Sequence, residues 1–516
     1  MGGAGLRLVD LLWHDVAHLP DQVALSIDGR TRTWRELGRR VDQVRQLLGR
    51  SIAPGERVGL WFHNSFAWVE TFLALNALGA VAVPINTRLT GRELEVIFHA
   101  ARLHALVTTR RYRGRQYADE AAAVLARAGG HLQVFEALDD EPPTAWPVAS
   151  IGTVSERSTC RTPPQVFCIQ YTSGTTSIPK GVMLTDAAYL ATAAYVARCQ
   201  RLTPSSRFIS AGPFFHCSGS MHALTVCMLA GCTLHSMSVW DPERFVDEVA
   251  AHRCDVSHMV YYRDVLALGA GRTREKLASM QVTHDLGTPA FLLRIRDELG
   301  IPGVSNLYGM TETAGQYTMW FPDDPIELRV TGNGRPQPGN GIRIVDPQDR
   351  RVLGVDQVGE IQMRGPTVSP GYFENPDAQA AAFTSDGWFR SGDLGRIGAQ
   401  GQLVYVARLK EMIRVGGENV APAEVEQVLR DLCGTSAVCV LGVPDERLEE
   451  VAAAVLVAPR ACEWPDVLGQ LRQRLAGFKV PRAIYVADAL PMTATNRVQR
   501  ATLLSWIRED RLQKVV

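Results

Sequence analysis

The chain has 516 residues, 46% of them hydrophobic, and its 54 Lys and Arg residues are balanced by 54 Asp and Glu residues. This length allows roughly three domains, and the hydrophobic content excludes a disordered chain. A net charge of zero offers no bulk attraction for nucleic acid or an anionic membrane, so we expect neither as a partner.

The cysteines and the N-terminus point to a cytoplasmic protein. The 10 cysteines form no C-x-x-C pair, which favours buried thiols over disulfides or metal ligands. The N-terminus has no basic region followed by an apolar stretch, so no signal peptide is predicted. The longest apolar stretches, such as 74–85, are too short to span a bilayer.

Helical and strand patterns alternate along the first two thirds of the chain. Such alternation is typical of βαβ units with a parallel sheet. The spacing of apolar residues predicts helices at 8–19, 33–48 and 66–78 and strands at 57–62, 80–84, 105–109 and 166–172.

From about residue 332 the pattern changes to short strands separated by Gly and Pro. A further compact unit begins after Arg408, and its size suits a small independent domain. The predicted strands of the β-rich part are 341–345, 359–363 and 403–406, and those of the last unit are 437–443 and 451–457, with helices at 422–432 and 464–475.

A polar loop follows the strand predicted at 166–172. Hydroxyl side chains and glycine precede Lys180, which lies between Pro179 and Gly181. Backbone donors with one cation suit a polyphosphate, although the spacing is not that of a Walker A loop. An ordinary polar surface loop is the alternative. The position of the lysine between Pro and Gly, after such a polar run, favours phosphate binding. The predicted phosphate-binding residues are Thr172, Ser173, Gly174, Thr175, Thr176 and Lys180.

This segment resembles the signature of the adenylate-forming superfamily, which contains acyl-CoA synthetases, peptide-synthetase adenylation domains and beetle luciferases. The resemblance extends from about Leu8 to Leu504. It implies an α/β fold: a large N-terminal domain of βαβ sheets with a small β-rich subdomain, followed by a mobile α+β C-terminal domain. We place the domains at 1–407, with the subdomain at about 332–407, and at 412–516. The hinge is expected at 408–411, with Lys410 as its pivot.

The stretch from Asn306 to Glu312 carries the strongest further match. The resemblance implies that Tyr308 stacks on adenine, that Thr311 bonds a phosphate oxygen, and that Glu312 holds Mg²⁺ together with Thr176. A strand-end loop with a solvated glutamate is the alternative. The residues of this stretch expected at the nucleotide are Asn306, Tyr308, Gly309 and Thr311, and those expected at the acyl group are Gly309 and Met310.

Two weaker motifs gain their meaning from the resemblance. Gly287, Thr288 and Pro289 resemble the turn along the adenine, where small residues permit close approach of the backbone. His216 ends an aromatic cluster and matches a residue beside the acyl group. Without the resemblance, an ordinary turn and a core histidine would be favoured.

The C-terminal third supplies the expected ribose and coenzyme A contacts. Asp393 and Arg408 match the ribose contacts of the superfamily. Gly416 and Gly417 match a glycine-rich strand beside the pantetheine tunnel, where side chains would not fit. Lys479 matches a residue that meets a nucleotide phosphate in coenzyme A ligases. These features favour coenzyme A over a carrier protein.

The chain departs from the superfamily pattern at several positions. Ser177 replaces a glycine of the phosphate loop, and Arg497 stands where relatives have a lysine that bridges the carboxylate and the α-phosphate. Arginine keeps the charge but is bulkier, planar and forked. The alternative is that Arg497 faces solvent and that Arg500, or no residue, replaces the lysine.

The acyl region is also unusual. Tyr261 and Tyr262 would make a shallow aromatic pocket, and Arg263 would pair with an anionic substituent of the acid. The alternative places both tyrosines in the core and Arg263 on the surface.

The motifs predict an acyl-CoA synthetase that uses ATP, Mg²⁺ and coenzyme A. A carboxylate would attack the α-phosphorus of MgATP, and the coenzyme A thiol would then attack the acyl-adenylate. The partner is a small carboxylic acid, aromatic or medium-sized; a homodimer and an acyl carrier protein are further candidates. The rivals are an adenylating enzyme with another acceptor or an unusual oxyacid, and a non-catalytic nucleotide-binding homologue. The catalytic candidates are Lys180, Thr311, Glu312, Arg497 and His216.

Overall fold

The structure is a computed structural model. It describes residues 5–516 apart from 90, 129–131, 140, 152–161, 164, 173–178, 259–260, 416–417, 436, 446, 458–462 and 493–497.

The described part of the chain divides into two compact units. The first contains Met1–Ile342, Met363–Phe389 and Gln400–Leu403, and the second contains Arg343–Gln362, Arg390–Ala399 and Val404–Val516. The stretch predicted as a β-rich subdomain therefore contributes residues to both units. The predicted domain boundary and the hinge at 408–411 stay predictions.

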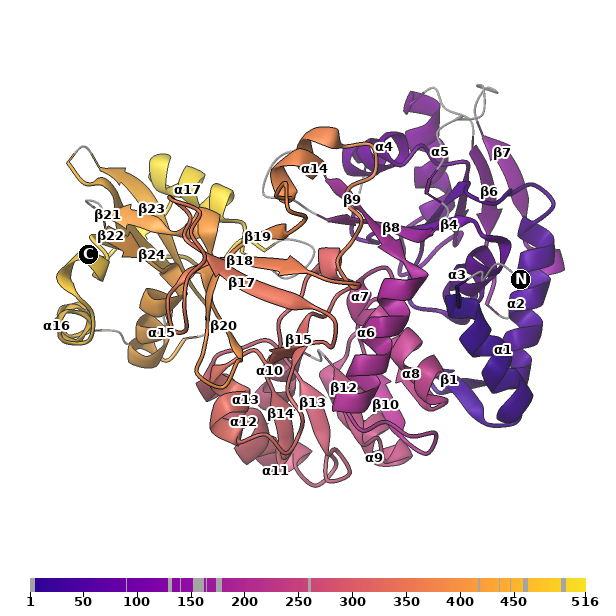
Figure 1. The fold of residues 1–516 in the computed structure, drawn as a ribbon, viewed down its shortest axis with the longest axis horizontal. Coiled ribbons are helices and arrows are strands. Elements are labelled where there is room, and N and C mark those ends of the chain that lie inside the picture. Colours follow the sequence, from indigo (N-terminus) through magenta and orange to yellow (C-terminus); the bar gives the residue numbers. More distant parts are fainter. Residues whose placement is uncertain are drawn as a thin grey trace. The chain divides into compact units, whose positions relative to one another are not determined.

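The first unit holds, within the described residues, two seven-stranded sheets. One has the strand order β7-β6-β5-β3-β4-β8-β9. Its inner pairs are parallel, whereas β6 with β7 and β8 with β9 are antiparallel. Helices α4 and α5 pack on one face (Figure 1). The elements are β3 (Arg57–Trp61), α3 (Phe66–Leu78), β4 (Val81–Pro84), α4 (Gly91–Ala100), β5 (Ala105–Thr108), α5 (Tyr117–Ala128), β6 (Leu132–Glu136), η1 (Pro143–Ala145), β7 (Val148–Ile151), β8 (Val166–Thr172) and β9 (Lys180–Thr185).

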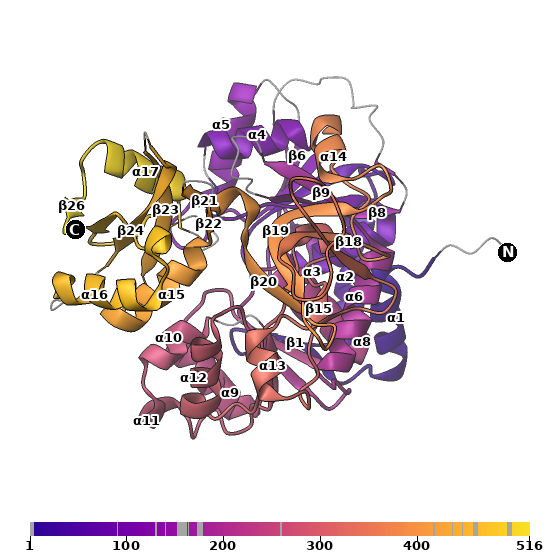
Figure 2. The same cartoon turned by 60° about the vertical axis from the view of Figure 1, so that its left-hand side comes forward.

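The second sheet has the order β14-β13-β12-β10-β11-β1-β2, and only its β1–β2 edge pair is antiparallel among the pairs described. Helices α9, α10 and α12 share an apolar core with it and lie together in Figure 2. The elements are β1 (Val23–Ile27), β2 (Arg30–Thr33), α6 (Asp186–Cys199), β10 (Arg207–Ser210), α7 (Cys217–Gly219), η2 (Ser220–Thr225), α8 (Val226–Ala230), β11 (Thr233–Ser236), α9 (Pro242–His252), β12 (Val256–His258), α10 (Tyr262–Ala267), α11 (Ala270–Thr273), β13 (Val282–His284), α12 (Pro289–Leu299) and β14 (Gly303–Ser305).

Local sequence explains where α2 (Trp34–Leu48) begins and which of its faces is buried. The Thr33 hydroxyl accepts from the Glu36 amide at 3.2 Å, and the Glu36 carboxylate accepts from the Thr33 amide at 2.8 Å, which is a capping box. Leu37, Val41 and Val44 recur at helical spacing and are buried. Helix α1 (Leu8–His18) packs against α2 and α3.

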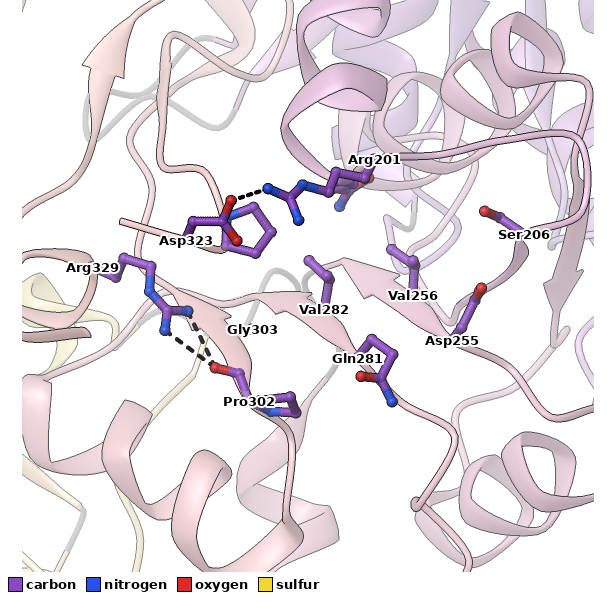
Figure 3. A pocket seen from close by; sticks show the side chains of 12 residues that line it. Arg201, Ser206, Asp255, Val256, Gln281, Val282, Pro302, Gly303, Asp323 and Arg329 are labelled. Atoms are coloured by element: carbon purple, nitrogen blue, oxygen red, sulfur yellow. Dashed lines mark hydrogen bonds and ion pairs between the residues drawn. The ribbon is translucent and has the colours of Figure 1, made fainter. Parts of the chain in front are cut away.

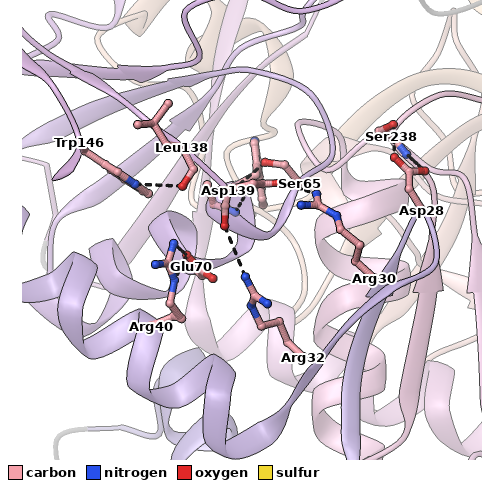
Figure 4. Close-up of polar contacts among 12 residues, drawn as sticks. Asp28, Arg30, Arg32, Arg40, Ser65, Glu70, Leu138, Asp139, Trp146 and Ser238 are labelled. Atoms are coloured by element: carbon pink, nitrogen blue, oxygen red, sulfur yellow. Dashed lines mark hydrogen bonds and ion pairs between the residues drawn. The ribbon is translucent and has the colours of Figure 1, made fainter. Parts of the chain in front are cut away.

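Helix α3 is apolar on nearly all sides. Its one charged residue, Glu70, is buried and lies beside Arg40 in Figure 4. Arg40 of α2 donates from Nε to Glu70 Oε2 at 3.0 Å, so the buried carboxylate has a partner. Burial raises the pKa of Glu70 to about 7. Nearby, Asp139 accepts from the Ala67 amide at 2.8 Å and pairs with Arg30 at 3.0 Å.

The remaining elements complete the first unit and form the second. A four-stranded sheet has the order β17-β18-β19-β20, and the α+β part contains β22-β21-β24-β25-β26, with β23 on β24, in the described residues. Helices α15 and α16 cover the latter sheet. The elements are η3 (Thr311–Thr313), β15 (Thr318–Met319), α13 (Ile326–Thr331), β16 (Arg335–Pro336), β17 (Gly341–Val345), β18 (Gly359–Arg364), α14 (Pro376–Ala382), β19 (Phe389–Ile397), β20 (Leu403–Arg408), η4 (Leu409–Glu411), β21 (Ile413–Val415), β22 (Glu418–Val420), α15 (Pro422–Cys433), β23 (Val438–Asp445), β24 (Glu449–Leu456), α16 (Trp464–Arg474), η5 (Gly477–Lys479), β25 (Ala483–Val486), α17 (Arg500–Arg508) and β26 (Gln513–Lys514).

Two expectations concern the chain as a whole. The described cysteines, which exclude Cys160 and Cys462, are all buried free thiols. Of the helices in the described ranges, none has the length and apolar character needed to cross a bilayer.

Candidate functional site

The predicted phosphate loop joins two antiparallel strands at one end of their ladder. Thr172 ends β8 and Lys180 begins β9, and the two residues are paired in register. The Thr172 hydroxyl lies 3.5 Å from the Lys180 carbonyl oxygen. Ser173, Gly174, Thr175 and Thr176 lie outside the described residues. The two ends of the loop therefore lie next to each other at the end of the strand pair, and Lys180 is one of these ends.

Lys180 and Glu312 are connected by Tyr372. The Lys180 Nζ lies 5.1 Å from the centroid of the Tyr372 ring, and the Tyr372 hydroxyl donates to Glu312 Oε1 at 2.9 Å. The backbone of Ser369 also donates to the Glu312 carbonyl oxygen, at 2.7 Å. Two groups that the sequence assigned to phosphate and magnesium thus contact the same tyrosine, one at its ring and the other at its hydroxyl.

The charges at this ring suit a magnesium-bound polyphosphate. In the described part of the chain, no side chain donates to the second carboxylate oxygen of Glu312, and no carboxylate pairs with Lys180. An available carboxylate oxygen is the ligand that Mg²⁺ prefers, and an available ammonium suits a phosphate oxygen. The residues therefore fit the ion.

The loop from Tyr308 to Gly315 is tightly folded. A Cβ at Gly309 would lie 2.3 Å from the Gly315 carbonyl oxygen, so no larger residue fits there without movement. The Thr313 hydroxyl accepts from the Met310 amide at 3.1 Å. The Tyr308 carbonyl accepts from the amides of Tyr317 and Thr318. This leaves Met310, Thr311 and Glu312 half-buried, with Tyr308 nearly enclosed.

The predicted adenine turn lies at the carboxyl end of β13, beside that of β14. Asn306 follows β14 and donates from Nδ2 to the Gly287 carbonyl oxygen at 2.9 Å. Thr288 caps α12 through the Phe291 amide at 3.3 Å, and Pro289 takes the first helical position. Ligands of open α/β sheets bind at this carboxyl edge. The structure therefore brings together Gly287, Thr288, Pro289 and Asn306 at one edge of the sheet.

The backbone around His216 is anchored to β8 and to the loop after β3. Gln170 of β8 donates to the Phe215 carbonyl oxygen at 2.8 Å, and the side chain of Asn64 accepts from the Phe214 amide at 2.7 Å. His216 is half-buried and caps α7 by accepting from the Ser218 amide at 3.2 Å. It is not an enclosed core histidine.

The three consecutive residues of the unusual acyl region differ in burial and in surroundings. Tyr262 is fully buried, and its hydroxyl hydrogen-bonds to Ser257 at 2.7 Å. Arg263 is exposed and lies 4.3 Å from the Phe291 ring. Tyr261 is half-buried and contacts the Trp240 ring at 5.3 Å. The core alternative thus fits Tyr262, and the surface alternative fits Arg263.

In the second unit, the two predicted ribose contacts form an ion pair. Arg408 lies 2.9 Å from Asp393 Oδ1, and Asp393 is almost fully buried. Lys479, expected at a nucleotide phosphate, donates to the Glu424 carboxylate at 2.7 Å. Arg500 pairs with Glu426 at 3.1 Å, so it is engaged inside this unit.

Other predicted residues of the second unit have no described environment. Gly416, Gly417 and Arg497 lie outside the described residues. Lys410 lies in η4, and its side chain is not described.

A cavity of about 440 Å³ lies away from these residues (Figure 3). Its lining includes Val256, Val282 and Gly303, which are the first residues of β12, β13 and β14. It therefore opens at the amino edge of the sheet, opposite the carboxyl edge that carries the adenine turn. Arg329 also lines it and donates to the Pro302 and Val304 carbonyl oxygens.

One group among the described residues has the composition of a metal site. His235, Glu248 and His252 place ligand atoms within 4.8 Å of one another. However, the two histidine rings stack, with centroids 4.5 Å apart and planes at 30°. A metal lies in the plane of each imidazole that binds it, at about 2.1 Å, and stacked rings do not meet at such a point. We assign the group to ring packing and to the Glu248–His252 contact at 3.2 Å.

Comparison with known families places this chain in a class. Residues 12–373 match the model of the AMP-binding enzyme, and residues 424–497 match that of the AMP-binding enzyme C-terminal domain. The chain therefore belongs to the AMP-binding enzyme family. The predicted membership of the adenylate-forming superfamily is confirmed.

Individual relatives cover nearly the full length of the chain. It is 34% identical over 503 residues, 95% of this chain and 96% of the relative, to 3-[(3aS,4S,7aS)-7a-methyl-1,5-dioxo-octahydro-1H-inden-4-yl]propanoyl:CoA ligase of Mycobacterium tuberculosis. It is 32% identical to feruloyl-CoA synthase of Amycolatopsis sp, over 93% of this chain and 94% of the relative.

Solved structures give the same result for the fold. ATP-bound MatB from Rhodopseudomonas palustris superposes with a TM-score of 0.85 at 26% identity, covering 98% of this chain and 100% of that chain. The o-succinylbenzoate CoA synthetase MenE from Bacillus subtilis, in complex with the acyl-adenylate intermediate OSB-AMP, gives a TM-score of 0.82 at 26% identity, with 96% and 97% covered. A MenE structure with ATP and magnesium ion is also similar, at 27% identity, a TM-score of 0.81 and coverage of 96% and 98%. The predicted α/β fold class is thereby confirmed.

Proposed function

We propose that this chain is an AMP-forming acyl-CoA ligase. It activates a carboxylic acid with ATP to give an acyl-adenylate and pyrophosphate, and it then forms a thioester with coenzyme A. The prediction from the motifs agrees with the relatives, which are CoA ligases, and with the acyl-adenylate held by a similar structure. The observation that carries the proposal in this chain is that Lys180 and Glu312 both contact Tyr372.

The first step needs positioning and charge neutralisation rather than a base. A carboxylic acid is already ionised at neutral pH, so its oxygen can attack the α-phosphorus directly. Mg²⁺ supplies neutralisation of the polyphosphate charge when it is bound. Lys180 would bind phosphate oxygens, and the Glu312 carboxylate would orient the ion. We assign Arg497 to the charge that develops during the displacement.

The second unit supplies the proposed ribose contacts and the second step. The Asp393 carboxylate, held by Arg408 at 2.9 Å, has the acceptor chemistry that two ribose hydroxyls require. For the thioester step we assign Gly416 and Gly417 to the thiol channel and Lys410 to the pivot. A cytoplasmic location, a homodimer and an acyl carrier protein stay predictions from the sequence.

We further propose that the acid carries a ring and a short carboxylate-bearing side chain. The substrates in the names of the relatives support this, because a bicyclic propanoate and ferulate both have that form. The contact between Tyr261 and Trp240 supports an aromatic neighbour for such a ring.

The decisive experiment is acid-dependent exchange of labelled pyrophosphate into ATP, measured over a panel of ring-bearing, short and long-chain acids. We expect exchange with ring-bearing acids and a coenzyme A thioester when the thiol is added. Absence of exchange with every acid would refute the ligase assignment. Exchange followed by transfer only to an amine or a carrier-protein thiol would refute coenzyme A as the acceptor.

A further inference from the structure

Tyr372 belongs to none of the motifs recognised in the sequence, yet it contacts two of them. It is 7% exposed and lies in the stretch 369–373, between β18 and α14. That stretch lies alongside β9 and is hydrogen-bonded to it. The Met183 amide donates to the Gly371 carbonyl oxygen at 2.9 Å, and the Phe373 amide donates to the Gly181 carbonyl oxygen at 2.8 Å. The ring is therefore held beside the strand that Lys180 begins.

The hydroxyl of Tyr372 is a fixed donor. It donates to Glu312 Oε1 at 2.9 Å. One oxygen of the Glu312 carboxylate is therefore occupied by this donor. The carboxylate is thereby restricted to orientations in which its other oxygen is available.

The ring of Tyr372 is a support for the ammonium group. Lys180 Nζ lies 5.1 Å from the ring centroid, within the range of a cation–π contact. A lysine side chain has several rotatable bonds and loses entropy when a ligand fixes it. A ring that already limits the position of the ammonium lowers that cost.

The backbone around Tyr372 is itself constrained. Gly371 has φ +132, and a Cβ there would overlap the Gln379 side chain. Gln379 Oε1 accepts from the Tyr372 amide at 3.0 Å. The Ser369 hydroxyl donates to the Met183 carbonyl oxygen at 2.7 Å. The backbone that carries the ring cannot move away from β9 without breaking several of these contacts.

We propose that Tyr372 is a positioning residue for the nucleotide. Its hydroxyl orients the Glu312 carboxylate for the magnesium ion, and its ring places the Lys180 ammonium for the phosphates. The inference depends on the proposed function, because it assigns roles in MgATP binding. The two parts of the Tyr372 side chain have different roles. The hydroxyl affects nucleotide binding through the magnesium ion, and the ring affects it through Lys180.

The test compares Tyr372→Phe, which keeps the ring, with Tyr372→Leu, which removes ring and hydroxyl. ATP binding is measured by calorimetry in excess Mg²⁺ and again in EDTA. Loss of a hydrogen bond to a charged group predicts about a tenfold weaker binding of MgATP for Tyr372→Phe. Binding of ATP in EDTA should stay within about twofold for that variant. Tyr372→Leu should weaken binding in both conditions.

Tyr195→Phe is the matched control, because its hydroxyl is also buried and donates to one acceptor, the Arg335 carbonyl oxygen at 3.2 Å. It should bind ATP like the wild type in both conditions, and thermal unfolding reports the folding of every variant. Equal changes with and without Mg²⁺ for Tyr372→Phe, or no change in either, would overturn the assignment. Wild-type binding of MgATP without acid-dependent exchange would instead refute the proposed function.

Discussion

Replacing Gly309 with alanine tests whether the tightness of the Tyr308–Gly315 loop matters for catalysis. The added Cβ would lie 2.3 Å from the Gly315 carbonyl oxygen and 2.7 Å from the Gln316 Cα. Both are backbone atoms, which cannot rotate away as a side-chain tip can. The loop must therefore shift by about 1 Å, and a displacement of that size near reacting groups costs about 100-fold in rate. This corresponds to about 2.7 kcal/mol of transition-state stabilisation.

The assay is the rate of acid-dependent pyrophosphate exchange below saturation. Gly469→Ala is the control, because that glycine lies in α16 with nothing within 4 Å of an added Cβ. It should leave exchange unchanged and raise helix stability slightly. A rate for Gly309→Ala within about threefold of the wild type, in a variant that unfolds at the same temperature as the wild type, would refute the steric argument.

Three further outcomes follow. The pKa of Glu70 is raised from 4.5 to about 7 by burial, so the folded state keeps a proton that the unfolded state has lost. The free energy of unfolding should therefore fall by about 3 kcal/mol as pH rises from 4.5 to 7. Glu70→Gln should remove this pH dependence in urea unfolding, and an unchanged pH dependence in that variant would contradict the role of Glu70. Arg497→Lys should preserve or raise adenylation, whereas Arg497→Ala should lower it and spare transfer from preformed acyl-adenylate; an unaffected first step in Arg497→Ala would exclude this cation. Asp393→Asn should weaken both ATP and AMP binding about tenfold by calorimetry, and wild-type affinity for AMP would contradict the ribose role.

Elements governed by neighbouring residues were predictable from the sequence. The strand at 166–172 and the helix at 33–48 agree with β8 and α2, the helix to within a residue. The capping box of Thr33 and Glu36 and the 3.6-residue spacing of buried positions act within the helix itself. The motif segments near Lys180, Asn306 and Asp393 were visible for the same reason, since each is a short run of consecutive residues.

The tertiary structure alone decided which residues enclose one another. The sequence left Tyr262 between pocket and core, and a hydroxyl partner on β12 places it in the core. Tyr372 has no motif of its own, because its role depends on contacts with Lys180, 192 positions earlier (372 − 180), and Glu312, 60 positions earlier. Local spacing specifies an element and the face it buries. Contacts across such separations arise only when strands and loops pack, so no pattern along the chain records them.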